Sequence, residues 1–394
     1  MTTIPSRSAA AALALAAVLG VGACSDPAAE PAESGALAPG SLITDRPLTT
    51  AAALPSAERT ELITYVSEGS DGRPTLVSGT VAIPKGEVPE SGWPVISWAH
   101  GTTGVGDACA PSADTVGGPA HSYVARTTEM LDRWVADGYA VVQTDYEGLG
   151  TPGEHPYMNG DSAANSVVDI VRAARELEPA VGTSWVAMGH SQGGHAALYA
   201  AAVAADRAPE LDLAGVVSMA PGNRTSDTAA YFASGGPGIE AAVPFLPVLL
   251  IGAEAARPEL SADAMLTDAS RVLLTAARTG CMDDVRAAAA AVPADQVLAP
   301  DADLEGLAAY YRTQEPGELT PTVPTFVVQG TEDVLVGRPL TDQLTEGLCA
   351  NGSDLTYQVY EGADHRAVLE DSFDDVRAFT EGVLAGEAIE TTCS

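Results

Sequence analysis

Positive charge is scarce in this chain of 394 residues. Lysine and arginine together number 19, against 53 aspartates and glutamates, so the formal net charge at pH 7 is −34. Proteins that bind nucleic acid, or that dock electrostatically on anionic lipid, present clustered basic residues, and this composition argues against both classes. The acidic excess instead promotes solubility and favours neutral over anionic substrates.

Sequence patterns for metals and nucleotides are also missing. The six histidines are scattered, no H-E-x-x-H segment occurs, and the cysteines are too far apart for a zinc knuckle. Runs that look like G-x-G-x-x-G lack the strand and helix that a dinucleotide site requires. The sequence therefore predicts no metal site and no cofactor.

Apolar runs of transmembrane length are absent beyond the N-terminus. The run at 241–251 is too short to cross a bilayer and contains two prolines. At the N-terminus, Arg7 precedes an apolar stretch over 8–19, and the small residues 21–23 lead to Cys24. This succession is typical of a processed export signal rather than of a folded segment.

The export signal has two interpretations. Small residues before a cysteine resemble a bacterial lipobox, which predicts a signal peptide over 1–23, cleavage before Cys24 and lipidation of its thiol. Residues 24–45 would then form a flexible tether rich in proline, alanine, serine and glutamate. The alternative is an ordinary secretory signal cleaved near Ala23. We therefore expect an extracellular or cell-envelope protein, which lipidation would anchor to the outer face of the cytoplasmic membrane.

The most informative internal motif is the G-x-S-x-G segment GHSQG at 189–193. An apolar strand candidate at 185–188 precedes it, and an alanine-rich helix candidate at 194–205 follows it. A sharp strand-to-helix turn places its serine in a strained conformation, and glycines two residues to either side leave room for that turn. The motif therefore predicts Ser191 as an exposed nucleophile.

A serine nucleophile needs a base and a group that orients the base. His190 and His195 lie too close to Ser191 along the chain, and the histidines at 100, 121 and 155 precede it. His365 follows a strand candidate, and Asp333 follows the preceding one. The order Ser191, Asp333, His365 is that of an α/β-hydrolase triad, in which the acid fixes the tautomer of the histidine.

Such a triad also requires two backbone donors for the oxyanion. The first is predicted to be the N–H of Gln192, the residue after the nucleophile. The second should come from the turn HGTTG at 100–104, which follows the strand candidate 93–99. The N–H of Gly101 or of Thr102 is the predicted donor there.

The remaining chain alternates between strand and helix candidates. The strand candidates are 75–83, 94–99, 139–144, 185–188, 213–219, 324–329 and 355–360, and the helix candidates are 125–137, 161–177 and 193–205. This alternation predicts an α/β fold with a mostly parallel sheet flanked by helices. The regularity fails over 221–321, which predicts an inserted helical cap or lid between two parts of the core, 46–220 and 322–394.

Several segments of this chain together resemble the secretory lipase family of α/β hydrolases, including its actinobacterial members. They are WAHGTTG at 98–104, CAPS at 109–112, TDYEGLGTPGEHPYM at 144–158, DIVRAARELEP at 169–179 and GHSQGGH at 189–195. The resemblance covers residues 45–394. It implies a triad of Ser191, Asp333 and His365, and a cap between the sixth and seventh core strands.

Four cysteines follow Cys24, and an even number in an oxidising compartment suggests two disulfides with three possible pairings. The resemblance to the secretory lipases favours the pairs Cys109–Cys281 and Cys349–Cys393. The first would tie the oxyanion-side loop to the cap, and the second would fasten the C-terminal tail.

The leading interpretation is a serine carboxylic-ester hydrolase, a lipase or esterase, whose substrate is a neutral acyl ester. Leu246 and Leu250 of the apolar cap run could line an acyl tunnel, with the buried face of a cap helix as the plainer role, and Tyr146 is predicted at the rim of the site. A serine peptidase or amidase on the same fold, and a non-catalytic surface-binding protein, are the alternatives. The sequence leaves acyl length and oligomeric state open.

Overall fold

The computed structural model describes residues 37–234 and 239–393. The predicted signal peptide, Cys24 and most of the predicted tether lie outside the described residues. Within the described part, one sheet of nine strands runs in the order β1-β2-β3-β5-β4-β6-β7-β8-β9. Its strands are β1 Leu42–Pro47, β2 Arg59–Glu68, β3 Pro74–Ile83, β4 Trp93–Ala99, β5 Ala140–Thr144, β6 Val181–His190, β7 Asp212–Met219, β8 Thr325–Gly330 and β9 Leu355–Tyr360.

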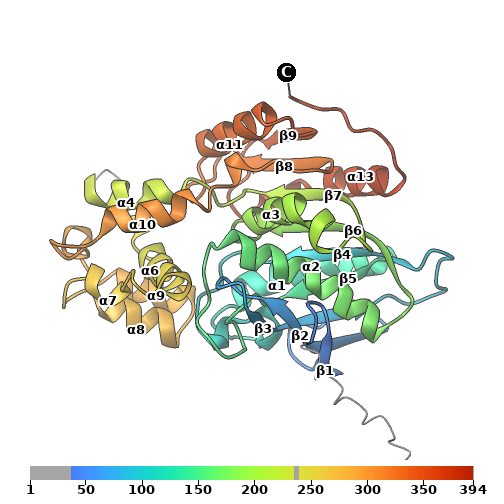
Figure 1. Ribbon diagram of the computed structural model, residues 1–394, viewed down its shortest axis with the longest axis horizontal. Helices are drawn as coiled ribbons and strands as arrows, with labels where there is room; N and C mark the ends of the chain where they lie inside the picture. Colours follow the sequence, from blue (N-terminus) through green and yellow to red (C-terminus); the bar gives the residue numbers. More distant parts are fainter. Residues whose placement is uncertain (1–36, 235–238, 394) are drawn as a thin grey trace, which may run out of the picture. The chain divides into compact units, whose positions relative to one another are not determined.

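The sheet is antiparallel at one edge and parallel elsewhere (Figure 1). Strands β1, β2, β3 and β5 pair antiparallel, whereas the pairs from β5 through β9 are parallel. Most residues of the parallel strands β4 to β8 are buried because helices cover both faces of the sheet there, whereas the edge strand β9 is half-buried. The predicted α/β fold with a mostly parallel sheet is therefore confirmed.

Helices on the two faces of the sheet build two hydrophobic clusters. The flanking helices are α1 His121–Ala136, α2 Gly160–Leu177, α3 Gln192–Arg207, α11 Arg338–Ala350, α12 Val368–Asp371 and α13 Phe373–Leu384. One cluster joins α2 and α3 to the sheet, and the other joins α1, α12 and α13 to its opposite side. Strands β1 and β2 lack a counterpart in the sequence prediction, and β1 is mostly exposed, so no hydrophobic period marks it.

The insertion between β7 and β8 forms a helical cap with its own apolar cluster. Its helices are α4 Thr225–Ser234, α5 Ile239–Ala242, α6 Phe245–Ala256, α7 Ala262–Met265, α8 Val272–Thr279, α9 Met282–Ala289 and α10 Leu304–Arg312. Figure 1 shows them gathered in one block beside the sheet. The cap is expected between the sixth and seventh core strands. It lies between the seventh and eighth strands of this sheet, because the edge strand β1 is counted as the first.

Covalent and polar contacts fasten the cap to the core. The disulfides Cys109–Cys281 and Cys349–Cys393 are both formed, which confirms the predicted pairing. Beside the first, the Met282 N–H donates to the Thr103 carbonyl at 3.0 Å. No helix of the described residues is both long and apolar enough to cross a membrane.

His195 anchors the returning end of the cap from inside the core. Its Nε2 donates to the carbonyl oxygen of Gln314 at 2.8 Å, and the residue is 1% exposed. Burial, only partly opposed by that hydrogen bond, lowers the pKa of His195 to about 4. The imidazole is therefore neutral in the folded protein at neutral pH.

Replacing His195 by glutamine keeps a donor for the Gln314 carbonyl but removes the titration. The unfolded histidine binds a proton near pH 6.5, so acidification favours unfolding until the folded pKa of about 4 is reached. Between these pH values, the unfolding free energy of the wild type should fall by about 3 kcal/mol more than that of His195→Gln. Urea unfolding over a pH series measures both curves; parallel curves would contradict the assignment.

Candidate active site

Ser191 occupies the turn between β6 and α3 in a backbone conformation that few residues adopt. Its φ is 60° and its ψ is −116°. The Ser191 N–H donates to the Met219 carbonyl at 2.8 Å, and the Gly222 N–H donates to the Ser191 carbonyl at 2.9 Å. A Cβ added at Gly189 would collide with the Gly193 carbonyl, so this turn accepts only glycine there. The result is the sharp elbow that the G-x-S-x-G motif predicts.

His365 and Asp333 form a hydrogen-bonded pair on the loops that follow β9 and β8. Asp333 Oδ2 lies 2.6 Å from His365 Nδ1 and also accepts from Gln329 Nε2 at 3.0 Å. Its Oδ1 accepts from the N–H groups of Leu335 and Val336 at 2.9 and 2.8 Å. Every one of these bonds favours the ionised carboxylate, so Nδ1 of His365 carries the proton and Nε2 is left for other partners.

The ionisation of Asp333 follows from this set of donors. Burial alone would raise the pKa of the carboxyl. The hydrogen bond and the charge of His365, together with the N–H of Val336 and the amide of Gln329, outweigh burial and hold the pKa of Asp333 below its usual value. Asp333 is therefore suited to orient the imidazole and to stabilise its cation, not to exchange protons itself.

One cavity brings the predicted nucleophile and base together. Its volume is about 430 Å³, and both Ser191 and His365 line it. Apolar and small side chains form most of the remaining wall, among them Tyr157, Met158, Ala241, Ala242, Phe245, Leu249, Val334, Leu335, Val336 and Leu340. The charged residues Arg224 and Asp227, also in the wall, pair at 2.6 Å. The cavity therefore suits an uncharged, largely apolar ligand.

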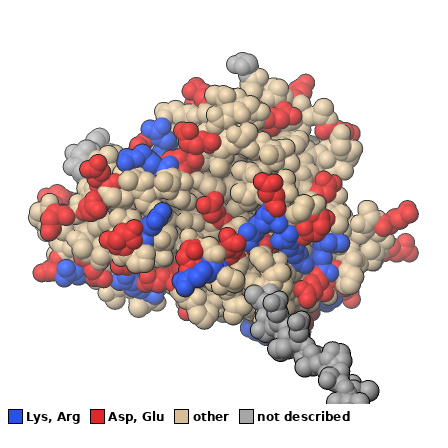
Figure 2. Space-filling model, viewed as in Figure 1, with Lys and Arg blue, Asp and Glu red and all other residues tan. Residues whose placement is uncertain are grey.

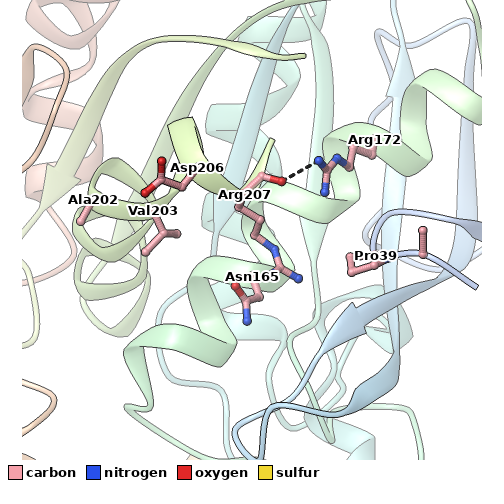
Figure 3. Close-up of a pocket in the computed structure, with 8 residues that line it drawn as sticks. Pro39, Asn165, Arg172, Ala202, Val203, Asp206 and Arg207 are labelled. Atoms are coloured by element: carbon pink, nitrogen blue, oxygen red, sulfur yellow. Dashed lines mark hydrogen bonds between the residues drawn. The ribbon is translucent and has the colours of Figure 1, made fainter. Parts of the chain in front are cut away.

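A larger hollow lies away from this pair. It measures about 750 Å³ and is lined by residues of α2 and α3 together with Ala38 and Pro39. Figure 3 shows the Arg172 guanidinium donating to the Arg207 carbonyl in this hollow. Arg207 pairs with Asp169, and Arg172 with Glu210, so both cations serve the fold. Without a nucleophile or a base in its wall, this hollow is not the candidate site.

The structure corrects one prediction about the oxyanion donor that is expected in the turn at 100–104. The N–H of Gly101 donates to the Tyr123 hydroxyl at 2.7 Å, so it is not free to meet a substrate, and the assignment of Gly101 as a donor is wrong. Thr102, the other candidate, donates or accepts through Oγ1 at the Tyr157 hydroxyl, 2.8 Å away. Gln192 is the first residue of α3 and lines the cavity. An N–H in the first turn of a helix has no acceptor within the helix.

The three predicted substrate-binding residues lie elsewhere. Tyr146 is 1% exposed, and its hydroxyl donates to the His100 carbonyl at 3.0 Å, away from the cavity wall. Leu246 and Leu250 have no exposed surface and pack inside the cap cluster. Phe245 and Leu249, one position earlier on α6, line the cavity instead. Because the whole run is apolar, its sequence cannot show which face of the helix meets the cavity.

Sequence reasoning also missed the residues that support the elbow. The Gln192 amide donates to His155 Nε2 at 2.8 Å, while His155 Nδ1 donates to the Glu147 carbonyl at 2.8 Å. His190, inside the motif, lies 2.7 Å from the His365 carbonyl oxygen. Tyr157 and Met158, which line the cavity, are the last two residues of the segment 144–158, one of those that resemble the secretory lipases. That resemblance was the only signal in the sequence that could have pointed to them. Histidines that bond backbone carbonyls leave no pattern of spacing in a sequence.

Charge and metal ligands add no competing site. Figure 2 shows acidic side chains spread over the visible face with basic side chains among them. Among the described residues, no group of three or more histidine, cysteine, aspartate or glutamate side chains is placed to hold a metal ion.

Comparisons with known proteins find relatives of this chain in sequence and in fold. In sequence, the chain is 26% identical to a probable inactive lipase of Mycobacterium tuberculosis over 314 residues, which are 74% of this chain and 66% of that relative. In structure, it is similar to Candida antarctica lipase A, with a TM-score of 0.75, 21% identity, and coverage of 92% of this chain and 86% of that one.

A rice cell wall degrading esterase from Xanthomonas oryzae gives a TM-score of 0.71 at 19% identity, covering 89% of this chain and all of the other. At these identities the structural likeness speaks for the fold alone. The sequence model of the family described as secretory lipase matches residues 121–373, a span that includes Ser191, Asp333 and His365. Because this match covers well over half of the chain, the protein belongs to the secretory lipase family of α/β hydrolases.

Proposed function

We propose that this protein is a serine carboxylic-ester hydrolase that acts on neutral acyl esters through Ser191, His365 and Asp333. The observation that carries the proposal is one shared cavity. The strained elbow serine and a histidine held at 2.6 Å by a buried carboxylate both face it. A serine, an imidazole and an ionised acid in this order are the parts of acyl transfer.

The reaction follows from these parts. His365 Nε2 accepts the proton of the Ser191 hydroxyl as its oxygen attacks the acyl carbon. The N–H groups of Gln192 and Thr102 are the proposed donors to the oxyanion. His365 then returns the proton to the departing alcohol, which leaves an acyl-serine. A water molecule then gives one proton to His365 Nε2 as its oxygen attacks the acyl carbon. The bond between the acyl carbon and Ser191 Oγ breaks, His365 returns the proton to that oxygen, and the acid is released.

The wall of the cavity supports the proposed substrate class. Phe245, Leu249, Tyr157 and Met158 offer apolar surface on the side of the cap and of the 144–158 loop. The pairing of Arg224 with Asp227 leaves no net charge for an anionic acyl group to bind. We therefore propose that the cavity binds an aliphatic acyl chain, which is part of the substrate of both lipases and esterases.

A second candidate function has one observation in its favour. The relative from Mycobacterium tuberculosis is named a probable inactive lipase. A non-catalytic binding protein on the same scaffold would retain the cavity but not react with a serine-directed reagent. Diisopropyl fluorophosphate labelling of Ser191 separates the two functions, and comparing an ester with its matched amide separates an esterase from a peptidase or amidase.

Export is the proposed setting of this activity. We infer that residues 1–23 direct the chain out of the cytoplasm and that Cys24 carries the lipid anchor that holds it at the membrane. The description of the family as secretory and the two formed disulfides support an extracytoplasmic site.

Single substitutions of the triad should abolish turnover without unfolding the protein. Ser191→Ala, His365→Ala and Asp333→Asn should each lower kcat for p-nitrophenyl acetate by about a thousandfold or more, because the three act as a unit. The double variant Ser191→Ala/His365→Ala should be no worse than Ser191→Ala. Circular dichroism checks folding, and a Ser191→Ala variant that retained more than a few per cent of wild-type turnover would contradict the proposal.

Neighbouring leucines of α6 should differ sharply in effect. Leu249→Trp adds bulk to the cavity wall and should lower the ratio of octanoate to acetate hydrolysis by about tenfold, since about 1.4 kcal/mol of lost acyl binding has that effect. Leu250→Ala, its matched control inside the cap cluster, should cost about 2–5 kcal/mol of stability and leave the ratio unchanged. Equal ratios in both variants would place the acyl chain elsewhere.

A further inference from the structure

A buried hydrogen-bonded chain joins the oxyanion-side turn to the loop that carries His365. The Gly101 N–H donates to the Tyr123 hydroxyl at 2.7 Å. That hydroxyl lies 3.1 Å from His190 Nδ1, and His190 Nε2 lies 2.7 Å from the His365 carbonyl oxygen. Tyr123 is 5% exposed and His190 is 1% exposed, so water does not compete for these bonds.

The direction of each bond in this chain is fixed by elementary chemistry. A carbonyl oxygen only accepts, so His190 Nε2 must donate to His365. In a neutral imidazole the other nitrogen then only accepts, so the Tyr123 hydroxyl must give its single proton to Nδ1. The oxygen of Tyr123 is thereby left to accept from Gly101. Each of these groups therefore has one fixed role as donor or acceptor. Reversing any one hydrogen bond would leave the next bond in the chain without a donor or without an acceptor.

The neutral state of His190 is secured by its surroundings. Burial first, and then the positive charge of the nearby His365, lower the pKa of His190 to about 3. The rings of His190 and His365 lie 4.6 Å apart between centroids. A neutral His190 therefore does not compete with His365 for the proton of the nucleophile, and it does not oppose the imidazolium that forms during the reaction.

The chain spans four separate parts of the fold. Gly101 follows β4, Tyr123 lies on α1, His190 ends β6 at the elbow, and His365 follows β9. We propose that Tyr123 and His190 are positioning residues, which hold the base at a fixed distance from the nucleophile and from the oxyanion-side turn. This proposal rests on the proposed function, because it gives the two residues a part in ester hydrolysis.

Tyr123→Phe tests the first half of the chain. It leaves the Gly101 N–H and His190 Nδ1 without partners and should lower kcat about 10- to 100-fold, with KM changed less than about twofold, because small misplacements of reacting groups have such effects. The control is Tyr65→Phe, which removes a buried hydroxyl bonded to Thr144 and Ser166 in the core. It should lower the melting temperature comparably and leave kcat unchanged.

Two substitutions of His190 test the second half. His190→Leu removes the donor to the His365 carbonyl and should lower kcat at least as much as Tyr123→Phe. His190→Gln retains an N–H donor and should recover at least half of that loss on a logarithmic scale. If both variants and Tyr123→Phe lost stability but kept wild-type kcat, as Tyr65→Phe should, the positioning role would be refuted.

A readout that does not depend on activity completes the test. In protein labelled with ¹⁵N-histidine, NMR should show His190 as the Nε2–H tautomer, neutral down to about pH 4. An Nδ1–H tautomer, or titration near pH 6, would refute the chain even in an active enzyme. Wild-type protein with the expected tautomer but with neither ester turnover nor Ser191 labelling would refute the proposed function, and the positioning role with it.

Discussion

The left-handed backbone of Ser191 is the constraint on which the rest of the site depends. A non-glycine residue in that conformation stores about 1–3 kcal/mol of strain, which its surroundings must offset. Hydrogen bonds to Met219 and from Gly222 hold it from the side of β7, and the glycines beside it let β4, β6 and α3 approach. Around the elbow, backbone segments contact one another directly. Alanines and glycines therefore occupy positions at which larger side chains would hold these segments apart.

Buried histidines form a second theme of this fold. His100, His155, His190 and His195 each bond a backbone carbonyl and each have a pKa lowered by burial, to about 4, 4, 3 and 4. Each bridges two segments that are distant in sequence or separated by a turn. Only His365 has an ionised carboxylate behind its ring and the cavity in front of it. Four of the six histidines in the chain therefore stabilise the fold by bonding backbone carbonyls and take no direct part in the proposed reaction.

The sequence predicts the order of the site residues along the chain, but not the direction in which individual side chains point. The order of Ser191, Asp333 and His365 could be read directly, because each follows a short run of apolar, β-branched or aromatic residues that forms a strand. The face of α6 that meets the cavity could not, since Phe245, Leu246, Leu249 and Leu250 are equally apolar. The partner of the Gly101 N–H could not either, because Tyr123 reaches it from another element.

The disulfide between Cys109 and Cys281 has a mechanical consequence. Together with the bond from Met282 to Thr103, it clamps the start of α9 to the turn that bears Thr102. The clamp fixes the start of α9, whereas the cap residues that line the cavity lie mainly on α4, α5 and α6. In a reducing environment the covalent part of this clamp would be lost, and the hydrogen bond from Met282 to Thr103 would remain between α9 and the 100–104 turn. The position of the turn that bears Thr102, a proposed donor to the oxyanion, is thus tied to the oxidation state of the surroundings.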